Sequence, residues 1–330
     1  MGRGHCAWCL VEPPIPGSPP KLTAVPQHLW RGDAASTSWC LTNLGSTPAS
    51  VFFEAESMSS VVGVELPDGR RVALKRRQAT DRVVACSQAH RAAWAAGVAC
   101  PELLAGPTRL DDGTWMTAER WVPDGSPEAP PDAATRYADL LHLLIAALRD
   151  SDPAAFDPPP PWAFYDHATP GRVWPPAASQ RWDPESPVVP AELRRLAAAA
   201  GERLRAEALP VVVGHSDLNG LNVRWAPEPI VHDWDSLAAR PEAVLAGIMA
   251  VNHVELPGRG AITALAETQR TLEVYQRSRP FSDTEVEIAW AAGLHVAAYN
   301  AAFEYLHGAR GAVAAKLADD GAERLRLAGC

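Results

Sequence analysis

The stretch GHSDLNGLNVRW, followed closely by IVHDWDSL, places polar side chains among apolar runs that are typical of buried strands. The residues concerned are His215, Asp217, Asn222 and Asp233. Because an unpaired buried carboxylate costs much free energy, this set predicts a site that binds a partner. Carboxylate and amide oxygens suit Mg²⁺, whose remaining ligands are often phosphate oxygens.

The spacing of these residues indicates phosphoryl transfer. In the pattern H-x-D-x-x-x-x-N of a kinase catalytic loop, the aspartate faces the attacking hydroxyl and the asparagine binds magnesium. We therefore expect Asp217 to orient an acceptor hydroxyl and to take its proton late, as the bond to phosphorus forms. A short hairpin after Asn222 would return Asp233 to the same cation.

A phosphate site also needs a fixed cation, and the run VALK places Lys75 on a strand after the turn Pro67-Asp68-Gly69. The V-A-I-K strand of kinases occupies this position, and its lysine reaches the nucleotide phosphates. The later strand TWMTAERWV runs into a cluster of Pro and Gly, where its backbone groups would meet a purine ring.

Because order, spacing and element type agree at these places, the sequence resembles the aminoglycoside phosphotransferase family from about Val51 onward. This family is the small-molecule branch of the protein-kinase-like fold, which also contains choline and homoserine kinases. The resemblance implies that Asp217 is the catalytic aspartate, that Asn222 and Asp233 bind magnesium, and that Lys75 binds nucleotide phosphates.

The resemblance also assigns the purine contact to the hinge residues Glu119, Trp121 and Val122. It gives His215 a structural role, in which the imidazole holds the catalytic loop. The implied cofactors are Mg²⁺ and ATP, with GTP as the alternative nucleotide.

The segment expected to cover the phosphates, EAESMSSVVGVEL, has no G-x-G-x-x-G pattern. Ser57, Ser59 and Ser60 would therefore bind phosphate through hydroxyls and backbone N–H groups. Short serine-containing loops are common in the small-molecule members of the family.

The helix expected over Thr80–Ala96 should offer a glutamate to Lys75, but it contains none. Gln88 is the nearest substitute by position, and it would hydrogen-bond the lysine without neutralising its charge. A weakly held lysine leaves open a non-catalytic, nucleotide-binding pseudokinase.

The sequence after the second aspartate makes a protein kinase the less favoured branch of the fold. Protein kinases continue with a long activation loop that ends in A-P-E. Here SLAARPEAVLAGIMA follows at once, and Pro241-Glu242 opens a helix. This leaves no room for a segment that docks a peptide.

The predicted fold class is α+β, a bilobal protein-kinase-like fold with a small antiparallel-sheet N-lobe and a mainly helical C-lobe. We expect a flexible arm over 1–35, a nucleotide-binding lobe over 36–121 and a catalytic and substrate lobe over 122–330. The segment 150–190 is rich in Pro and Trp, and it is interpreted either as an ordered flap or as a surface insertion.

Periodicity and turn residues locate the individual elements. The pattern turns to strands from Ser38, and after Asp233 it is helical to the end, with an S-x-x-E capping box at Ser282. Strands are expected at Ser50–Glu54, Ser60–Leu66, Arg71–Lys75, after Pro101 and at Thr114–Val122; helices are expected at Thr80–Ala96, Asp132–Leu148 and Ala191–Ala208.

The acceptor would lie against the helical lobe, where acidic side chains can attract and orient a polycation. An alternative is that these side chains simply form solvated helix faces. His295 on the last long helix either lines the acceptor pocket or is a core histidine. The residues named for acceptor binding are Asp235, Glu242, Glu255, Tyr299 and Glu304.

Composition restricts the class of partner. The chain has 330 residues, 47 % of them apolar, and a net charge of −9, which argues against a general nucleic-acid binder. No apolar run is long enough to span a bilayer, and the six cysteines form no disulfide framework. A cytoplasmic protein, monomeric or homodimeric and without membrane partners, is expected.

Three functions remain open at this point. The first is an ATP-dependent O-phosphotransferase acting on a small, cationic, hydroxylated molecule such as an antibiotic, which would make it a resistance enzyme. The second is a metabolic kinase of the same fold that acts on an amino alcohol or sugar. The third is the pseudokinase.

Overall fold

The computed structural model describes residues 34–56, 59–78, 82–122, 125–176, 183–256, 260–307 and 311–330. The chain forms two compact units. The first contains residues up to 83 and 101–123, and the second contains 84–100 and 124–330. The predicted arm lies outside the described residues, except for its last two positions.

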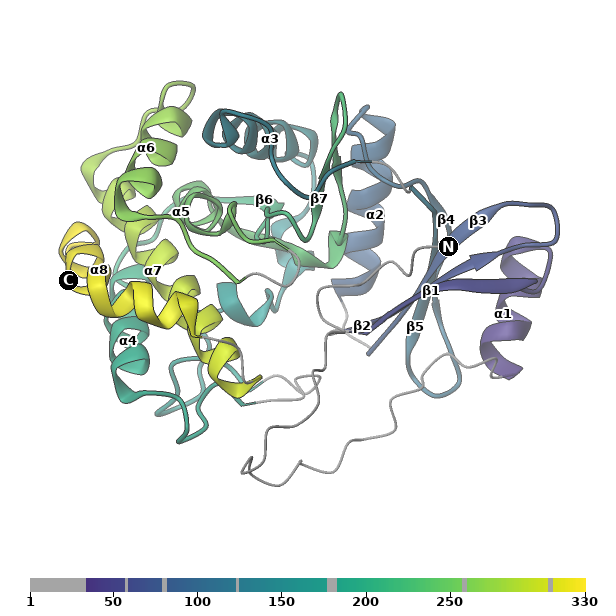
Figure 1. The fold of residues 1–330 in the computed structure, drawn as a ribbon, viewed down its shortest axis with the longest axis horizontal. Helices are drawn as coiled ribbons and strands as arrows, with labels where there is room; N and C mark the ends of the chain where they lie inside the picture. Colours follow the sequence, from purple (N-terminus) through teal and green to yellow (C-terminus); the bar gives the residue numbers. More distant parts are fainter. Residues whose placement is uncertain are drawn as a thin grey trace. The chain divides into compact units, whose positions relative to one another are not determined.

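The first unit contains a five-stranded antiparallel sheet (Figure 1). Its strands follow the order β1-β2-β3-β5-β4, so the two ends of the sheet are β1 and β4. The five predicted strands are confirmed, with bounds of β1 (Ser50–Glu56), β2 (Ser59–Glu65), β3 (Arg71–Arg77), β4 (Leu103–Arg109) and β5 (Trp115–Arg120).

Side chains alternate between the two faces of this sheet, as the pleat requires. Val72 and Leu74 of β3 belong to the apolar cluster on one face, together with Met116 and Ala118 of β5. Lys75 therefore points to the opposite face, where its strand partner is Thr117.

Residues 38–44 form part of helix α1 (Ala34–Leu44), so the prediction of strands from Ser38 was wrong there. Trp39, Cys40 and Leu44 pack into the apolar cluster of the sheet. A buried guanidinium adds a polar link, since Arg76 donates to Ser36 Oγ at 3.3 Å. Tertiary packing therefore decides the conformation of a segment whose local pattern is weak.

The second unit is mainly helical, as predicted. Helix α7 packs against α4, α5 and α8, and α5 and α7 approach so closely that a side chain at Gly247 would collide with the backbone of Ala289 (Figure 1). The helices are α2 (Arg82–Ala95, which begins in the first unit), α3 (Ala133–Ala147), α4 (Ala191–Arg205), α5 (Glu242–Asn252), α6 (Leu265–Gln276), α7 (Asp283–Leu306) and α8 (Ala312–Leu327).

Two short antiparallel strand pairs lie between these helices. β6 (Val211–His215) pairs with β9 (Leu237–Pro241), and β7 (Val223–Trp225) pairs with β8 (Pro229–Val231). Strand β9 contradicts the expectation of an uninterrupted helical region after Asp233. Because β6 and β9 pair, the residues that follow β6 lie beside those that precede β9.

The capping box predicted before the last long helix is confirmed. Ser282 Oγ accepts from the N–H of Glu285 at 3.3 Å, and the Glu285 carboxylate accepts from the N–H of Ser282 at 2.8 Å. These reciprocal bonds satisfy two N–H groups that the first turn of α7 would otherwise leave unpaired.

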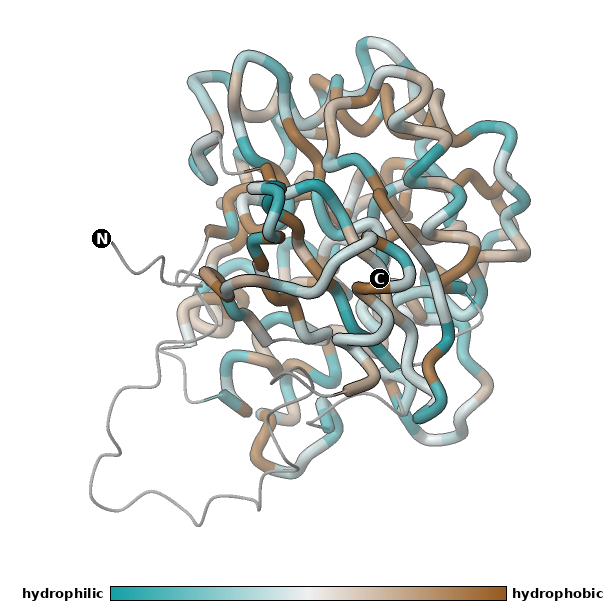
Figure 2. Tube along the Cα trace, turned by 90° about the vertical axis from the view of Figure 1, so that its right-hand side faces the viewer, coloured by the Kyte–Doolittle hydropathy of each residue, from teal (hydrophilic) through white to brown (hydrophobic). Residues whose placement is uncertain are grey.

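Hydrophobic and hydrophilic segments alternate along the chain and do not collect in one long apolar run (Figure 2). Among the described residues, no helix combines the length and the apolar character needed to cross a lipid bilayer.

The Pro- and Trp-rich segment contains two 3₁₀ turns, η1 (Pro153–Phe156) and η2 (Pro161–Ala163). Phe156, Tyr165 and Trp174 are buried in the main core of the second unit. The described part of this segment is therefore an ordered, core-forming element and not a surface insertion, while Trp182 lies outside the described residues.

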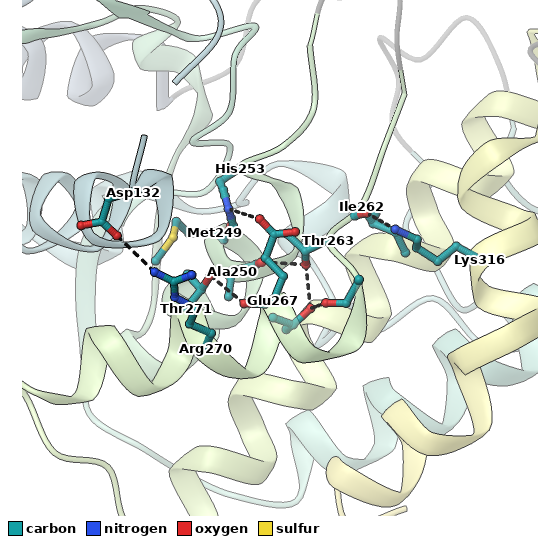
Figure 3. Close-up of polar contacts among 12 residues, drawn as sticks. Asp132, Met249, Ala250, His253, Ile262, Thr263, Glu267, Arg270, Thr271 and Lys316 are labelled. Carbon is teal, nitrogen blue, oxygen red and sulfur yellow. Dashed lines mark hydrogen bonds and ion pairs between the residues drawn. The ribbon is translucent and has the colours of Figure 1, made fainter. Parts of the chain in front are cut away.

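Helices α5 and α8 hold the irregular stretch before α6 in place. Lys316 Nζ donates to the carbonyl oxygen of Ile262 at 3.0 Å, and Thr263 Oγ1 donates to Ala250 O at 2.9 Å (Figure 3). The fully buried Arg324 makes a bidentate pair with Asp320, both bonds at 2.8 Å, and donates to Thr263 O at 2.7 Å.

We predict that Arg324→Met lowers the stability of the second unit by about 3–5 kcal/mol, because it leaves the Asp320 carboxylate and a buried carbonyl without their donor. Thermal unfolding followed by circular dichroism measures this loss. Arg326→Met on the same helix is the matched control, since Arg326 forms an exposed pair with Glu323 and should change stability by about 0.5 kcal/mol or less. Equal losses in the two variants would contradict the structural role of Arg324.

Candidate active site

The catalytic-loop sequence connects two short strands of the second unit. β6 ends at His215, β7 begins at Val223, and Asp217 lies in the intervening turn. Asn222 Nδ2 donates to Asp217 Oδ2 at 2.7 Å and to the Asp217 carbonyl at 2.9 Å. Asn219 Nδ2 donates to Asp217 Oδ1 at 2.9 Å. Both carboxylate oxygens of Asp217 are therefore fixed by amides.

His215 ties this loop to the hairpin that follows it. Its Nδ1 accepts from the backbone N–H of Asp217 at 3.2 Å, which leaves Nε2 as the donor to His232 O at 3.1 Å. The ring is buried, with 1 % exposed. This geometry suits the structural role predicted for His215.

Asn219 is a residue that sequence reasoning missed. It is fully buried and its side-chain oxygen accepts from the N–H of Leu221 at 2.9 Å, so the amide orientation is set from both ends. The same Nδ2 that donates to Asp217 also lies 3.2 Å from Glu255 Oε2. An asparagine two positions after the aspartate was the available signal.

Asp233 comes directly after the β7–β8 hairpin and adopts a left-handed backbone conformation, with φ 56° and ψ 56°. Such a conformation is unusual outside glycine, although Asp tolerates it better than most residues. Ser236 Oγ donates to Asp233 Oδ2 at 2.9 Å, and the carboxylate lies close enough to Asp217 to repel its negative charge.

The oxygens at this point suit a hard divalent cation. Both bonds donated by the Asn222 amide go to Asp217, so its side-chain oxygen stays available as a ligand beside the Asp233 carboxylate. Magnesium typically takes one or two protein oxygens and fills its shell with phosphate and water. Within the described ranges, no group of three or more His, Cys, Asp and Glu side chains forms a complete metal cage.

The loop lies directly against Glu255. The N–H of Gly220 donates to Glu255 O at 2.8 Å, and a Cβ at Gly220 would lie 2.6 Å from the carbonyl oxygen of Pro127. No larger residue fits there without moving backbone. A glycine at this position therefore brings the Glu255 carboxylate to the catalytic loop.

The carboxyl groups of Asp217 and Glu255 are partly buried and lie close to other carboxylates, which raises their pKa values. Burial raises the pKa of Asp217 to about 7, with a further rise from the Asp233 charge and opposing hydrogen bonds from Asn222 and Asn219. Burial likewise raises the pKa of Glu255 to about 8, helped by repulsion from Asp217 and Glu304. A positive charge placed beside Asp217 and Glu255 would reduce this repulsion and lower both pKa values.

Glu304 extends the acidic group from α7. Burial raises its pKa, while the Val313 N–H donates to its Oε2 at 2.9 Å and opposes that rise. Two members of the acidic group formed by Asp217, Glu255 and Glu304 were predicted from the sequence to bind the acceptor. They are Glu255 and Glu304. Glu255 and Glu304 interact electrostatically with each other.

The other residues named for the acceptor have different surroundings. Glu242 accepts from the Tyr275 hydroxyl at 2.7 Å and pairs with Arg279 at 3.4 Å, so it joins helices. Asp235 is partly exposed in the turn η3 (Trp234–Ser236). Tyr299 is buried on α7, with its ring 6.3 Å from that of Trp162.

His295 is a core histidine, the second of the two alternatives. Its Nδ1 contacts the Ala197 carbonyl oxygen at 3.2 Å, and burial lowers its pKa to about 4. The neutral ring packs near Trp174, with 6.2 Å between ring centroids.

In the first unit, Lys75 has a carboxylate partner that the sequence reasoning did not assign to it. Lys75 Nζ lies 3.1 Å from Glu119 Oε1, and both side chains are almost completely buried. Glu119 is opposite Ala73 on the neighbouring strand, two residues from Lys75 and on the same face. Sequence reasoning placed this partner on α2, where Gln88 is exposed and belongs to the second unit.

Of the other residues predicted to bind the nucleotide, not all lie within the described part of the chain. Ser59 and Ser60 begin β2, and Ser57 lies outside the described residues. The N–H of Trp121 already donates to Arg71 O at 3.0 Å, and its ring packs on Phe52. Among the three hinge residues, this leaves Val122, just beyond the end of β5, as the stronger candidate for a purine contact.

Several solved structures share this architecture at low sequence identity. A thermostable mutant of aminoglycoside phosphotransferase APH(4)-Ia, in a ternary complex with ADP and hygromycin B, matches with a TM-score of 0.56 and 12 % identity, covering 90 % of this chain and 99 % of that one. Amicoumacin kinase hAmiN in complex with AMP-PNP, Ca²⁺ and Ami matches with a TM-score of 0.55 and 13 % identity, over 85 % and 89 % of the two chains.

A putative fructosamine-3-kinase from Thermobifida fusca YX-ER1 gives a TM-score of 0.55 at 19 % identity, over 89 % of this chain and all of that one. At these identities the matches establish the fold, which confirms the predicted kinase-like class. No curated protein matches the sequence. The model of the phosphotransferase enzyme family matches residues 54–281, more than half of the chain. The protein therefore belongs to the phosphotransferase enzyme family.

Proposed function

We propose that the protein is an ATP-dependent O-phosphotransferase that moves the γ-phosphate to a hydroxyl of a small cationic molecule. The observation that carries the proposal is Asp217, whose two carboxylate oxygens are held by Asn219 and Asn222 while Asp233 lies nearby. Two neighbouring carboxylates repel each other, and a bound cation relieves that repulsion, so the arrangement favours a cation site over a purely structural role.

In the proposed reaction, Asp217 accepts a hydrogen bond from the acceptor hydroxyl, orients its oxygen for attack, and takes the proton late. Asn222 and Asp233 would hold Mg²⁺, which neutralises charge on the nucleotide phosphates when bound. Lys75, fixed by Glu119, binds phosphate oxygens. Positioning and charge neutralisation supply most of the catalysis in such reactions.

The acceptor is proposed to carry an ammonium group close to the hydroxyl that reacts. Burial raises the pKa of Glu255 to about 8, and repulsion from Asp217 and Glu304 adds to that rise. A cation placed beside these carboxylates would relieve the repulsion. The related structures contain hygromycin B and amicoumacin, so an antibiotic is our first choice, and with it a resistance function in the cytoplasm.

A metabolic kinase acting on an amino alcohol or amino sugar is the second candidate. The structure matched at the highest identity of those described above is named a putative fructosamine-3-kinase, and its named substrate class also combines an amine with hydroxyls. The pseudokinase alternative is weakened by the Lys75–Glu119 pair, because the lysine does not lack a counter-ion. ATP is the proposed donor, with GTP as the alternative, and the protein is proposed to act as a monomer or homodimer without nucleic-acid or membrane partners.

Magnesium-dependent ADP release tests the function directly. We expect stimulation by one class in a panel of aminoglycosides, other hydroxylated antibiotics, choline and sugars. Asp217→Asn should lower kcat by about 10³-fold or more, because it keeps the side-chain shape but removes the acceptor of the proton. A variant with the full rate of the wild type would disprove the role of Asp217. Tight nucleotide binding without stimulation by any compound would favour the pseudokinase.

The charge of Glu119 should matter for nucleotide use. We predict that Glu119→Gln lowers kcat/KM for ATP by about 10- to 100-fold, since Lys75 loses a charged partner at a buried position. Steady-state kinetics at saturating acceptor measures the change. The matched control is Glu102→Gln, which removes an exposed partner of Arg120 from the same unit and should leave kcat/KM unchanged. Equal effects of the two substitutions would argue against the pair.

The raised pKa of Glu255 predicts a pH-dependent stability. The folded protein keeps this proton up to about pH 8, whereas the unfolded chain loses it at about pH 4.3. The contribution of the protonated Glu255 to the free energy of unfolding is therefore complete at low pH and is lost as pH rises between these values. The melting temperature of Glu255→Gln should therefore fall less than that of the wild type between about pH 5 and about pH 9. Glu323→Gln, at an exposed ion pair, should keep the wild-type slope.

A further inference from the structure

The indole of Trp162 contacts the catalytic loop directly. Trp162 lies in η2 of the Pro- and Trp-rich segment, and its Nε1–H donates to Ser216 O at 3.0 Å and to Ser216 Oγ at 3.1 Å. Ser216 immediately precedes Asp217 in the chain. An element far away in the sequence therefore reaches the backbone one residue before the proposed catalytic group.

Ser216 is hydrogen-bonded in turn to Ser236, which contacts the second aspartate, Asp233. Its N–H and Oγ–H donate to Ser236 O at 2.9 and 2.7 Å. Ser236 Oγ in turn donates to Asp233 Oδ2 at 2.9 Å. Trp162, Ser216, Ser236 and Asp233 thus form a continuous polar path that is anchored at both aspartates, since Asp217 is bonded covalently to Ser216.

The other end of the path is held rigidly. The buried Arg240 of β9 donates through Nε to Ala163 O at 2.7 Å, pairs with Asp166 at 2.7 Å, and lies 4.9 Å from the ring centroid of Tyr165. Arg205 of α4 donates to Tyr165 O at 2.6 Å. Residues 161–166, which we name the Trp162 brace, are therefore fixed to β9 and to α4.

We infer that Trp162 is a positioning residue, and that the Trp162 brace sets the placement of both Asp217 and Asp233. The inference rests on the proposed function for its kinetic consequences. The carbonyl and hydroxyl of Ser216 are buried and have little freedom once Trp162 and Ser236 occupy them. Small misplacements of catalytic groups reduce rates strongly, so a remote indole can control the reaction without touching substrate.

Trp162→Phe tests the inference because it retains an aromatic ring and removes only the N–H and part of the ring. We expect kcat to fall by about 10- to 100-fold, the KM of the acceptor to change by less than about twofold, and the Mg²⁺ concentration for half-maximal rate to rise severalfold. Ser236→Ala, which cuts the last link to Asp233, should raise the Mg²⁺ requirement in the same direction.

Trp174→Phe is the matched control. It lies in the same segment and is fully buried, but among the described residues its indole nitrogen has no hydrogen-bond partner. It should lower the melting temperature at least as much as Trp162→Phe. Its kcat and its Mg²⁺ dependence should remain those of the wild type.

Hydrogen exchange of a peptide spanning 214–223, followed by mass spectrometry, gives a readout that does not need turnover. Exchange should become faster in Trp162→Phe and not in Trp174→Phe. If the wild type transfers no phosphate to any acceptor, the proposed function fails. The positioning role of Trp162 is then tested by hydrogen exchange alone. Wild-type exchange and kinetics in Trp162→Phe, or equal changes in both tryptophan variants, would overturn it.

Discussion

The structure of the second unit is organised around the cost of holding the partly buried Asp217 carboxylate close to that of Asp233. The side-chain amides of Asn219 and Asn222 donate hydrogen bonds to its two oxygens, and His215 Nδ1 accepts a hydrogen bond from the backbone N–H of Asp217. Hydrogen bonds of this kind offset part of the desolvation penalty. The remainder is visible in the raised pKa of Asp217, which a bound cation would lower again.

Every nearby element contributes to holding this group. The pairing of β6 with β9 places Ser216 beside Ser236, and the β7–β8 hairpin returns the chain to Asp233. Gly220 allows the loop to lie against the Glu255 backbone. The Pro- and Trp-rich segment, which has almost no regular structure, adds the indole of Trp162. A segment without regular secondary structure is thus fixed beside the proposed catalytic residue Asp217.

Much of the fold was predictable because turn residues and periodicity are local signals. The strands of the first sheet and helices α3, α4 and α7 follow from alternation, helical stripes and a capping box. The segment after Ser38 was misassigned because its helix depends on the packing of Trp39 against the sheet and on the hydrogen bond from Arg76 of β3 to Ser36. Strand β9 was missed because it is defined by its pairing with β6, which no local pattern reveals.

The chemical residues were predicted less evenly. Motif spacing correctly predicted that Asp217 lies near Asn222 and Asp233, since a short loop and a hairpin leave little geometric freedom. Contacts between residues distant in sequence were out of reach. Glu255 was named for the acceptor, but its contact with Asn219 was not predicted, and neither was the contact of Trp162 with Ser216. The pairing of Glu119 with Lys75 was missed because the register of β5 with β3, and hence the distance between the two side chains, is a property of the folded sheet.

The position of Glu119 has a consequence for control. In protein kinases the glutamate that pairs with the strand lysine sits on a helix, and moving that helix switches activity. Here the partner is on the neighbouring strand of the same sheet, so the pair forms when the sheet folds and persists as long as it does. The Lys75–Glu119 pair therefore depends on the register of two neighbouring strands and not on the position of a helix.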